Sequence, residues 1–236
     1  IKKNVPIAVK FLDKVINRNY YPIPEANNSN KKWRPVGLGV MGWQDLLFKL
    51  RIPFESEQAK TLAANVQEEI YYWALKTSME LAKELGAHDN FKKTHAAQGK
   101  LQFDFIQNVS LHSTDRWTEL KAEIKKHGLR NSLLIAIAPT ATIGQICGST
   151  ECIEPQVSNI FKRETLSGEF ITTNQYLVED LKKLNLWNQN MLDKIKLAEG
   201  SIQNIAGIPD DIKALYKTAW EIKQKALIDQ AVARGA

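Results

Sequence analysis

Cysteine is scarce in this sequence of 236 residues, which contains only Cys147 and Cys152. The two residues form neither a CxxC pair nor part of a framework of spaced cysteines, so disulfide-stabilised secreted domains are excluded. This pattern favours a reduced, cytoplasmic compartment. We interpret both cysteines as buried, chemically inert thiols, and redox chemistry is the less favoured alternative.

Long apolar runs and metal-binding spacings are also absent. No apolar run approaches the roughly 18 residues of a membrane span, and no signal sequence opens the chain, so we expect no membrane association. The four histidines show no ligand spacing such as HExxH, so we expect this chain to hold no metal. His127 is predicted in the last turn of a helix, where its charged form would stabilise the C-terminus, and we favour this structural role over catalysis.

The excess of positive charge is modest and dispersed. The formal net charge is +6, and hydrophobic residues make up 44% of the chain, which is ample for a core. The basic doublets are scattered along the chain, which favours solvated faces over a nucleic-acid-binding stripe. These doublets are Lys31-Lys32, Lys92-Lys93, Lys125-Lys126, Lys162-Arg163 and Lys182-Lys183. We therefore expect no nucleic acid partner.

Hydrophobic periodicity predicts a helix-rich chain. Pro6 suits a first helical turn, and the following apolar residues (Ala8, Phe11, Leu12, Val15 and Ile16) are expected to face a core. Residues 20–30 are predicted to be a loop because of their prolines and asparagines. Residues 34–42 are predicted to form a strand whose glycines (Gly37, Gly39 and Gly42) allow close backbone approach. We favour tight packing of a helix on this strand over contact of the glycines with a ligand. Residues 43–50 are predicted to form a short helix.

Further helices are predicted from capping residues. Ser56 is expected to begin the longest helix and Gly86 to end it, with its apolar stripe in the core. Residues 98–105 are ambiguous. Four more helices are predicted: from Thr114 or Asp115 to His127-Gly128 with Trp117, Leu120 and Ile124 inward, from Asn174 to Leu184, from Asn188 to Glu199-Gly200, and from Pro209 to Arg234-Gly235.

The stretch from residue 133 to 138 is uniformly apolar and ends at Pro139. Such a run predicts a strand buried on both faces, as in parallel sheets. Small and hydroxyl residues follow it, at the place where α/β folds bind their ligands. The loop could hold an anion through threonine hydroxyls and backbone amides, or it could be an ordinary turn in which Thr142 is the N-cap of a helix.

Long motifs in this region carry a resemblance to a known family. They are APTATIGQI at residues 138–146, ECIEPQVSNIFKRETLSGEF at 151–170 and IPDDIKALYKTAWEI at 208–222. Further matching stretches are YYPIPEANNSNKKWRPVGLGVMGWQDLLFKL, RIPFESEQAKTLAANVQEEIYYWAL and AKELGAHDNF. Together they resemble the catalytic large subunit, or α chain, of class I ribonucleotide reductase over nearly the whole chain.

The resemblance implies an α/β fold that forms part of the ten-stranded βα barrel of these enzymes, with residues 34–42 and 133–138 as its two readable strands. Residues 1–236 are expected to be one internal or C-terminal-half segment of the catalytic barrel domain, without an independent second domain. The implied activity is the reduction of ribonucleoside diphosphates to deoxyribonucleoside diphosphates for DNA synthesis. This is the chemistry of an oxidoreductase that is a radical and allosteric enzyme.

The resemblance also assigns a substrate site. In the family, the loop that matches Pro139, Thr140, Ala141, Thr142 and Ile143 binds the phosphates of the nucleoside diphosphate. A common family form has a second hydroxyl residue where this chain has Ile143, so one side-chain donor is absent and the backbone amide must serve instead. The site is still expected to form.

No catalytic residue is expected within this segment. The family's radical cysteine lies upstream of the part matched by Ile1, and its radical-conducting tyrosine pair lies beyond Ala236. Neither cysteine of this chain matches the catalytic or redox cysteines, and Tyr20-Tyr21 and Tyr71-Tyr72 do not match the tyrosine motif. The isolated chain is therefore expected to be inactive.

The family implies several partners and cofactors. We expect the remainder of the large subunit, a second copy of that subunit in a homodimer, and a small subunit that carries a metal and radical cofactor. ATP and deoxynucleotide effectors and thioredoxin or glutaredoxin as reductant are also implied for the complete enzyme. The alternative is a noncatalytic interaction module, derived from a split or truncated reductase gene, whose helices bind another polypeptide.

Overall fold

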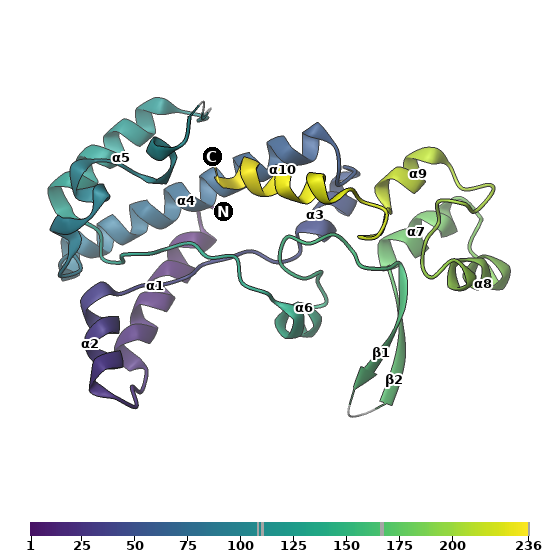
Figure 1. Ribbon diagram of the computed structural model, residues 1–236, viewed down its shortest axis with the longest axis horizontal. Helices are drawn as coiled ribbons and strands as arrows, with labels where there is room; N and C mark the ends of the chain where they lie inside the picture. Colours follow the sequence, from purple (N-terminus) through teal and green to yellow (C-terminus); the bar gives the residue numbers. More distant parts are fainter. Residues whose placement is uncertain (108, 110, 166–167, 236) are drawn as a thin grey trace. The chain divides into compact units, whose positions relative to one another are not determined.

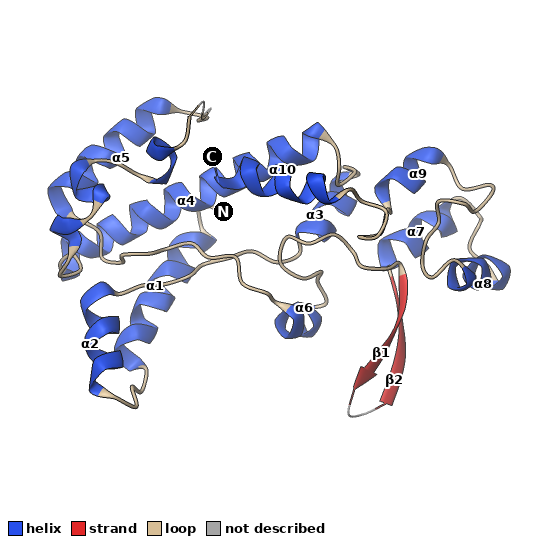
Figure 2. Cartoon of the chain, in the orientation of Figure 1, coloured by secondary structure: helices blue, strands red, loops and turns tan. Residues whose placement is uncertain are grey.

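The computed structural model describes residues 1–107, 109, 111–165 and 168–235. The described residues are mainly helical and include one antiparallel pair of strands (Figures 1 and 2). They form two compact units. The first unit contains residues 1–39, 61–138 and 231–236, and the second contains residues 40–60 and 139–230.

The first unit is built from helices and short 3-10 turns. Tryptophan at position 117 is 2% exposed and packs edge-on against Phe103 and Tyr72. The predicted inward face of the helix after residue 113 is confirmed, because Trp117, Leu120 and Ile124 are all buried. The elements are α1 (Asn4–Arg18), α2 (Pro24–Trp33), most of α4 (Glu57–Leu85), η1 (Phe91–Lys93), η2 (His95–Gln98), η3 (Gln102–Phe105) and α5 (Thr114–His127).

The prediction of a loop over residues 20–30 is wrong, because α2 occupies most of this range. Pro24 stands at the start of the helix, where its fixed φ is favourable and its missing N–H is not needed. The charges of Glu25 in the first turn and Lys31 in the last turn suit the helix dipole. Arg34 then adopts a left-handed conformation with φ of 48° and ends the helix.

The predicted core face of α1 is wrong in part. Val9 and Ile16 are buried, but Phe11 is 66% exposed and Val15 is 40% exposed. Asp13 lies on the buried face instead, where its carboxylate pairs with Arg34 at 2.8 Å. A pattern of apolar residues does not reveal a buried ion pair, so the face predicted from it is rotated away from the actual buried face.

The two predicted strands are extended segments that run parallel to each other. The Val36 N–H donates to the Leu133 carbonyl at 3.0 Å, and the Ala136 N–H donates to the Leu38 carbonyl at 3.1 Å. Among the described residues, the pairing amounts to one isolated parallel bridge between Leu38 and Ile135, so neither segment is a full strand.

Two glycines bring these segments close together, as predicted. A Cβ atom on Gly39 would lie 2.4 Å from the Ala136 carbonyl oxygen, and one on Gly37 would lie 3.0 Å from the Ala136 Cβ. The neighbour is thus a parallel extended segment and not a helix.

The expectation that residues 133–138 are buried on both faces is wrong in this structure. Leu134 is 6% exposed, but Leu133 is 66% exposed and Ile137 is 37% exposed. Burial on both faces requires covering elements on both sides. In the described part of the chain, residues 36–38 pair with this segment, and Leu134 is its one buried side chain.

The second unit has its own hydrophobic core. Leu181 and Ile202 are fully buried, and the rings of Phe48 and Tyr216 lie 4.9 Å apart. The elements are α3 (Trp43–Leu50), α6 (Ala141–Cys147), β1 (Ile160–Thr165), β2 (Gly168–Thr173), α7 (Gln175–Lys183), α8 (Gln189–Leu197), α9 (Asp210–Leu215) and most of α10 (Gln224–Gly235).

Three predicted helix caps are confirmed. The side-chain oxygen of Asn174 accepts from the Tyr176 N–H at 3.1 Å, and that of Asn188 accepts from the Met191 N–H at 2.9 Å. The Ser56 hydroxyl accepts from the Ala59 N–H at 3.1 Å at the start of α4. These side chains satisfy amides that have no partner inside the helix.

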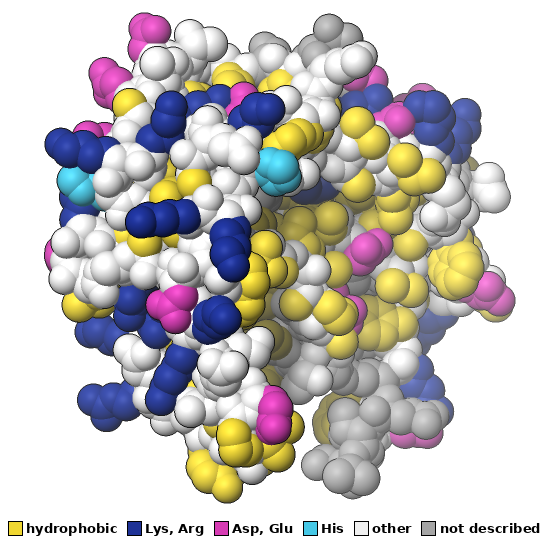
Figure 3. Space-filling view, turned by 60° about the vertical axis from the view of Figure 1, so that its left-hand side comes forward, with side chains coloured by type: hydrophobic (Ala, Val, Ile, Leu, Met, Phe, Trp, Pro, Cys, Tyr) yellow, Lys and Arg dark blue, Asp and Glu magenta, His cyan; other side chains and the backbone are white. Residues whose placement is uncertain are grey.

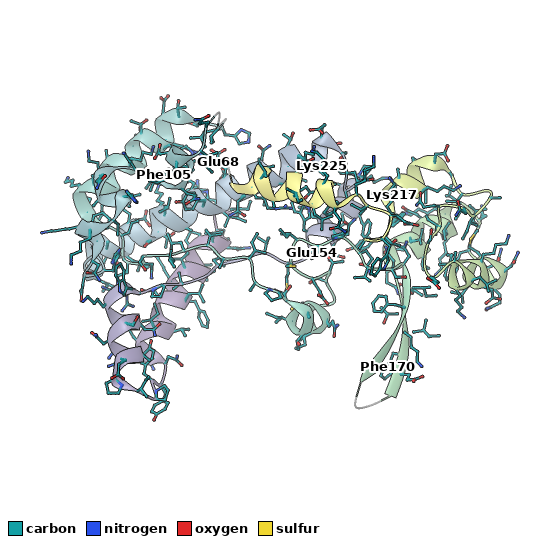
Figure 4. The ribbon with its side chains drawn as sticks, viewed as in Figure 1. Glu68, Phe105, Glu154, Phe170, Lys217 and Lys225 are labelled. Carbon is teal, nitrogen blue, oxygen red and sulfur yellow. The ribbon has the colours of Figure 1, made fainter. Side chains whose placement is uncertain are left out.

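The β1–β2 hairpin was not predicted. Its register pairs Ile160 with Thr173 and Lys162 with Ile171, and Lys162 forms an ion pair of 2.6 Å with Glu169. Phe170, labelled on this hairpin in Figure 4, is 52% exposed. A strand of this kind lacks the strict alternation of apolar and polar residues on which the prediction depended.

The prediction of a single helix from Pro209 to Gly235 is also wrong, because α9 ends at Leu215 and α10 begins at Gln224. In the intervening segment, backbone amides donate hydrogen bonds to carboxylates. Glu221 accepts from the Thr218 N–H at 2.7 Å, and Glu55 accepts from the Lys223 N–H at 3.1 Å. Such side-chain acceptors compete with the helical pattern of hydrogen bonds.

Charged side chains are mixed on the face shown in Figure 3, where lysines and arginines are dispersed among uncharged and acidic groups. A search for membrane-spanning helices among the described residues finds none with the necessary length and hydropathy.

Candidate functional site

The predicted phosphate loop lies in the second unit, at the start of α6. Thr140 is the N-cap residue, and Ala141, Thr142 and Ile143 form the first turn. Thr140 is half-buried, whereas Pro139 and the three first-turn residues are exposed. The Gly144 N–H closes the turn by donating to the Thr140 carbonyl at 2.7 Å. Four of the five loop residues are therefore exposed.

The alternative in which Thr142 is only an N-cap is wrong. The cap position belongs to Thr140, and Thr142 lies inside the helix. The structure also gives Thr140 no hydrogen bond from its side chain to the helix amides. The Thr140 hydroxyl is thus not used to cap α6.

The Thr140 hydroxyl has a defined partner. The Cys152 N–H donates to its Oγ1 atom at 2.8 Å. A hydroxyl has two acceptor positions and one donor proton, and this contact uses an acceptor position. The proton of Thr140 is left to donate to an acceptor outside the loop.

The segment after α6 folds back to the start of α3. Gly148 ends α6 in a left-handed conformation, and the Ser149 N–H donates to the Gly144 carbonyl at 2.8 Å. The Gly42 N–H then donates to the Thr150 carbonyl at 2.9 Å. We call residues 148–152 the return loop, since they bring the chain back beside Thr140.

Asp45 holds the return loop from α3. Its Oδ2 atom accepts from the Thr150 N–H at 2.6 Å and from the Thr150 hydroxyl at 2.9 Å. Tyr176 also faces this carboxylate: burial, then the charge of Asp45 and a hydrogen bond to it, raise the pKa of Tyr176. No sequence motif marks Asp45, because an acid in the first turn of a helix is an ordinary feature.

The two cysteines differ in environment. Cys152 is 8% exposed, in agreement with the expected buried thiol, but Cys147 is exposed, so the expectation is wrong for that residue. Both are free thiols. A search of the described residues finds no cluster of three or more His, Cys, Asp or Glu side chains that could bind a metal ion.

The first unit contains a separate cavity of about 460 Å³, lined in part by Glu68, Tyr71, Phe105 and Trp117. Glu68 and Phe105 are labelled in Figure 4. The Glu68 carboxylate is already used: it accepts from the Trp117 Nε1–H at 2.9 Å and pairs with Arg116 at 2.8 Å. Burial opposes ionisation, but these hydrogen bonds outweigh it and lower the pKa of Glu68. The Glu68 carboxylate thus has its partners within the first unit.

Comparison with protein families gives one match that covers the whole chain. A family described as "Ribonucleotide reductase, barrel domain" matches residues 1–236. The chain is 49% identical over 231 residues to the ribonucleoside-diphosphate reductase large chain of Schizosaccharomyces pombe, which covers 98% of this chain and 28% of that protein.

Other relatives give the same result. The chain is 50% identical over 226 residues to the large subunit of this reductase from Dictyostelium discoideum, covering 95% of this chain and 26% of the relative. It is 46% identical over 236 residues to the large subunit from Variola virus, covering 100% of this chain and 30% of the relative. The chain thus spans less than a third of the length of these relatives.

Among solved structures, the chain is similar to the Actinobacillus ureae class Id ribonucleotide reductase alpha subunit. The TM-score is 0.75 with 26% sequence identity, and the match covers 98% of this chain and 38% of that one.

Proposed function

The chain belongs to the ribonucleotide reductase barrel-domain family, and we propose that it acts within a complete large subunit that reduces ribonucleoside diphosphates. The extent of the family match, over residues 1–236, supports the assignment of both units to one catalytic barrel domain. The relatives described above are named as reductase subunits, which gives no support to a noncatalytic interaction module.

Within that subunit, Pro139, Thr140, Ala141, Thr142 and Ile143 bind the phosphates of the substrate. The observation that carries this proposal is the hydrogen bond from the Cys152 N–H to the Thr140 Oγ1 atom, at 2.8 Å. It leaves the hydroxyl proton as a donor, which is the group that a phosphate oxygen requires. Thr142 supplies a second exposed hydroxyl, and Ile143 offers its backbone amide.

The chain supplies the substrate-phosphate loop, and other parts of the enzyme supply the chemistry. The radical cysteine, its reductant cysteines and the tyrosine pair come from the remainder of the large subunit. A small subunit provides the metal and radical cofactor, ATP and deoxynucleotides act as effectors, and thioredoxin or glutaredoxin supplies electrons. The large subunit forms a homodimer in the cytoplasm. The isolated chain has no turnover, because positioning a substrate cannot replace a hydrogen-abstracting thiyl radical.

The test is nucleoside-diphosphate binding by the complete large subunit with Thr140→Val or Thr142→Val. Valine keeps the shape of threonine and removes the hydroxyl donor. Thr118→Val is the matched control, since the Thr118 hydroxyl is exposed in α5 and donates to the Thr114 carbonyl. Weaker binding in both loop variants and unchanged binding in the control are expected. Unchanged affinity in both loop variants would overturn the proposed role of the loop in phosphate binding.

A further inference from the structure

We propose that Asp45 is a positioning residue for the phosphate loop. Its carboxylate holds the return loop so that the Cys152 amide directs the Thr140 hydroxyl toward the bound diphosphate. This inference rests on the proposed function of Thr140 and adds a residue that no motif in the sequence identifies.

The first link joins Asp45 to Thr150. One carboxylate oxygen accepts from both the N–H and the hydroxyl of Thr150, at 2.6 and 2.9 Å. Hydrogen bonds to an ionised acceptor are shorter and stronger than those between neutral groups. The Gly42 N–H donates to the Thr150 carbonyl at 2.9 Å, so the same residue is held from both sides of its backbone.

The second link runs from Thr150 to Cys152, two residues along the chain. Cys152 has a φ of +26°, in the left-handed region that residues other than glycine adopt infrequently. Such a conformation persists when surrounding contacts fix it. Here its carbonyl accepts from the Trp43 N–H at 3.3 Å, while its own N–H points to Thr140. The start of α3 thus determines the direction of the Cys152 amide.

The third link is the Thr140 hydroxyl. A threonine side chain can rotate, and its proton can point to any nearby acceptor. Since the Cys152 N–H occupies one acceptor position at 2.8 Å, the proton is directed elsewhere. Loss of the Cys152 contact would free the hydroxyl to rotate, and the donor would no longer be preoriented for a phosphate oxygen.

Asp45 itself is unsuited to contact the substrate. Its negative charge would repel a diphosphate, and its carboxylate is occupied by Thr150 and faces Tyr176. Its effect on binding must therefore pass through the return loop. This separates it from Thr140, whose hydroxyl meets the ligand directly.

The experiment measures KM and kcat for a nucleoside diphosphate with the complete large subunit, its small subunit and a dithiol reductant. The variants are Asp45→Ala, Asp45→Asn, Thr140→Val and the double variant Asp45→Ala/Thr140→Val. Asp211→Ala is the matched control, because Asp211 is also an acid in the first turn of a helix of the second unit. The denaturation midpoint of each variant is measured in parallel.

We expect Thr140→Val to raise KM by roughly tenfold to a hundredfold, where each factor of ten corresponds to about 1.4 kcal/mol. Asp45→Ala is expected to raise KM by a similar factor with a smaller change in kcat. The double variant should be no worse than Thr140→Val alone, since both changes remove the same contact. Asp45→Asn keeps an acceptor for Thr150 and should restore most of the loss, whereas Asp211→Ala should leave KM unchanged.

The outcomes distinguish the two proposals. An unchanged KM for Thr140→Val overturns the phosphate loop and this inference with it. A raised KM for Thr140→Val, together with an unchanged KM for Asp45→Ala or with additive effects in the double variant, overturns only the role of Asp45. If Asp45→Ala does not fold, Thr150→Val takes its place in the same cycle, because it removes one donor to Asp45 and keeps the backbone contact with Gly42. If Thr150→Val leaves KM unchanged, or if its effect on KM is additive with that of Thr140→Val, the inference is overturned.

Discussion

The carboxylate of Asp13 and the guanidinium of Arg34 form a buried ion pair in the first unit. The Oδ1 atom of Asp13 lies 2.8 Å from Nη2 and 2.9 Å from Nε of Arg34, and the two residues are 2% and 4% exposed. The Asn131 side chain donates to the same oxygen at 3.0 Å and to the Arg34 carbonyl at 3.1 Å. This cluster joins α1, the end of α2 and the segment that leads to residue 133.

Replacement of Asp13 with alanine should destabilise the first unit strongly. Removal of one partner leaves the charge of Arg34 buried and uncompensated, which typically costs about 3–5 kcal/mol. The measurement is the urea denaturation midpoint of the 236-residue chain. Lys225→Gln is the control, because Lys225 pairs with Asp229 on an exposed surface, where such pairs contribute little to stability. Equal losses in the two variants would contradict the importance of the buried pair.

Substitution of the loop threonines should separate ligand binding from stability. We expect Thr140→Val and Thr142→Val each to weaken nucleoside-diphosphate binding by roughly tenfold to a hundredfold, since a hydrogen bond to a charged oxygen contributes about 1.5–3 kcal/mol. Thr140→Val also removes the acceptor of the Cys152 N–H, so its denaturation midpoint should fall, whereas that of Thr142→Val should stay near wild type. Isothermal titration and urea denaturation of the same variants measure the two effects.

His88 should make the stability of the first unit dependent on pH. The side chain is 3% exposed, with its ring 6.0 Å from those of Trp33 and Phe91, and its Nδ1 atom has no hydrogen-bond partner among the described residues. Burial lowers the pKa of His88 from the ordinary value of 6.5, and the charge of Asp89 opposes this shift. The neutral form is therefore the one that the folded chain favours.

Because the pKa of His88 is lowered in the folded state, the unfolded chain binds more protons as the pH falls below 6.5. The contribution of neutral His88 to the free energy of unfolding is complete above that pH. It is lost as the pH falls from 6.5 toward the pKa of His88 in the folded chain. Denaturation midpoints measured between about pH 7.5 and pH 5 should show this slope. The slope should be shallower in His88→Phe, which keeps an aromatic ring and cannot titrate. An identical slope in both proteins would assign the pH dependence to other groups.

The helices with capping residues could be predicted from the sequence, and the contacts that shape the site could not. Asn174 and Asn188 predict the starts of their helices because a cap is a local interaction between residues two to three positions apart. The Asp45–Thr150 contact joins residues 105 positions apart, so no local pattern reveals it. The proposed phosphate loop follows from family motifs, whereas its alternative, the Thr142 cap, comes from local reasoning and is wrong.

The burial of the predicted strands also depends on contacts between residues far apart in the sequence. Apolar runs identify residues 133–138 as extended, but burial depends on which elements cover them, and that information is not local. The glycines at 37 and 39 were more informative. Their prediction required only that another backbone approach closely, and the structure identifies this backbone as the segment around Ala136.

Two alanine substitutions should distinguish the two kinds of close approach at this pairing. A Cβ on Gly39 would lie 2.4 Å from the Ala136 carbonyl oxygen, so Gly39→Ala forces the backbones apart and should lower the unfolding free energy by about 1–3 kcal/mol. A Cβ on Gly37 would meet the Ala136 Cβ at 3.0 Å, so Gly37→Ala should cost less.

The addition of Ala136→Gly tests the cause of each loss. Ala136→Gly removes the Cβ that Gly37→Ala would touch. The loss of unfolding free energy in the Gly37→Ala/Ala136→Gly variant should therefore be smaller than the sum of the losses in the two single variants. Ala136→Gly leaves the carbonyl oxygen in place, so the combination with Gly39→Ala should show no such reduction of the loss. Urea denaturation of the single and double variants gives both coupling energies. Equal coupling in the two pairs would show that the segments do not approach each other in the register given by the Leu38–Ile135 bridge.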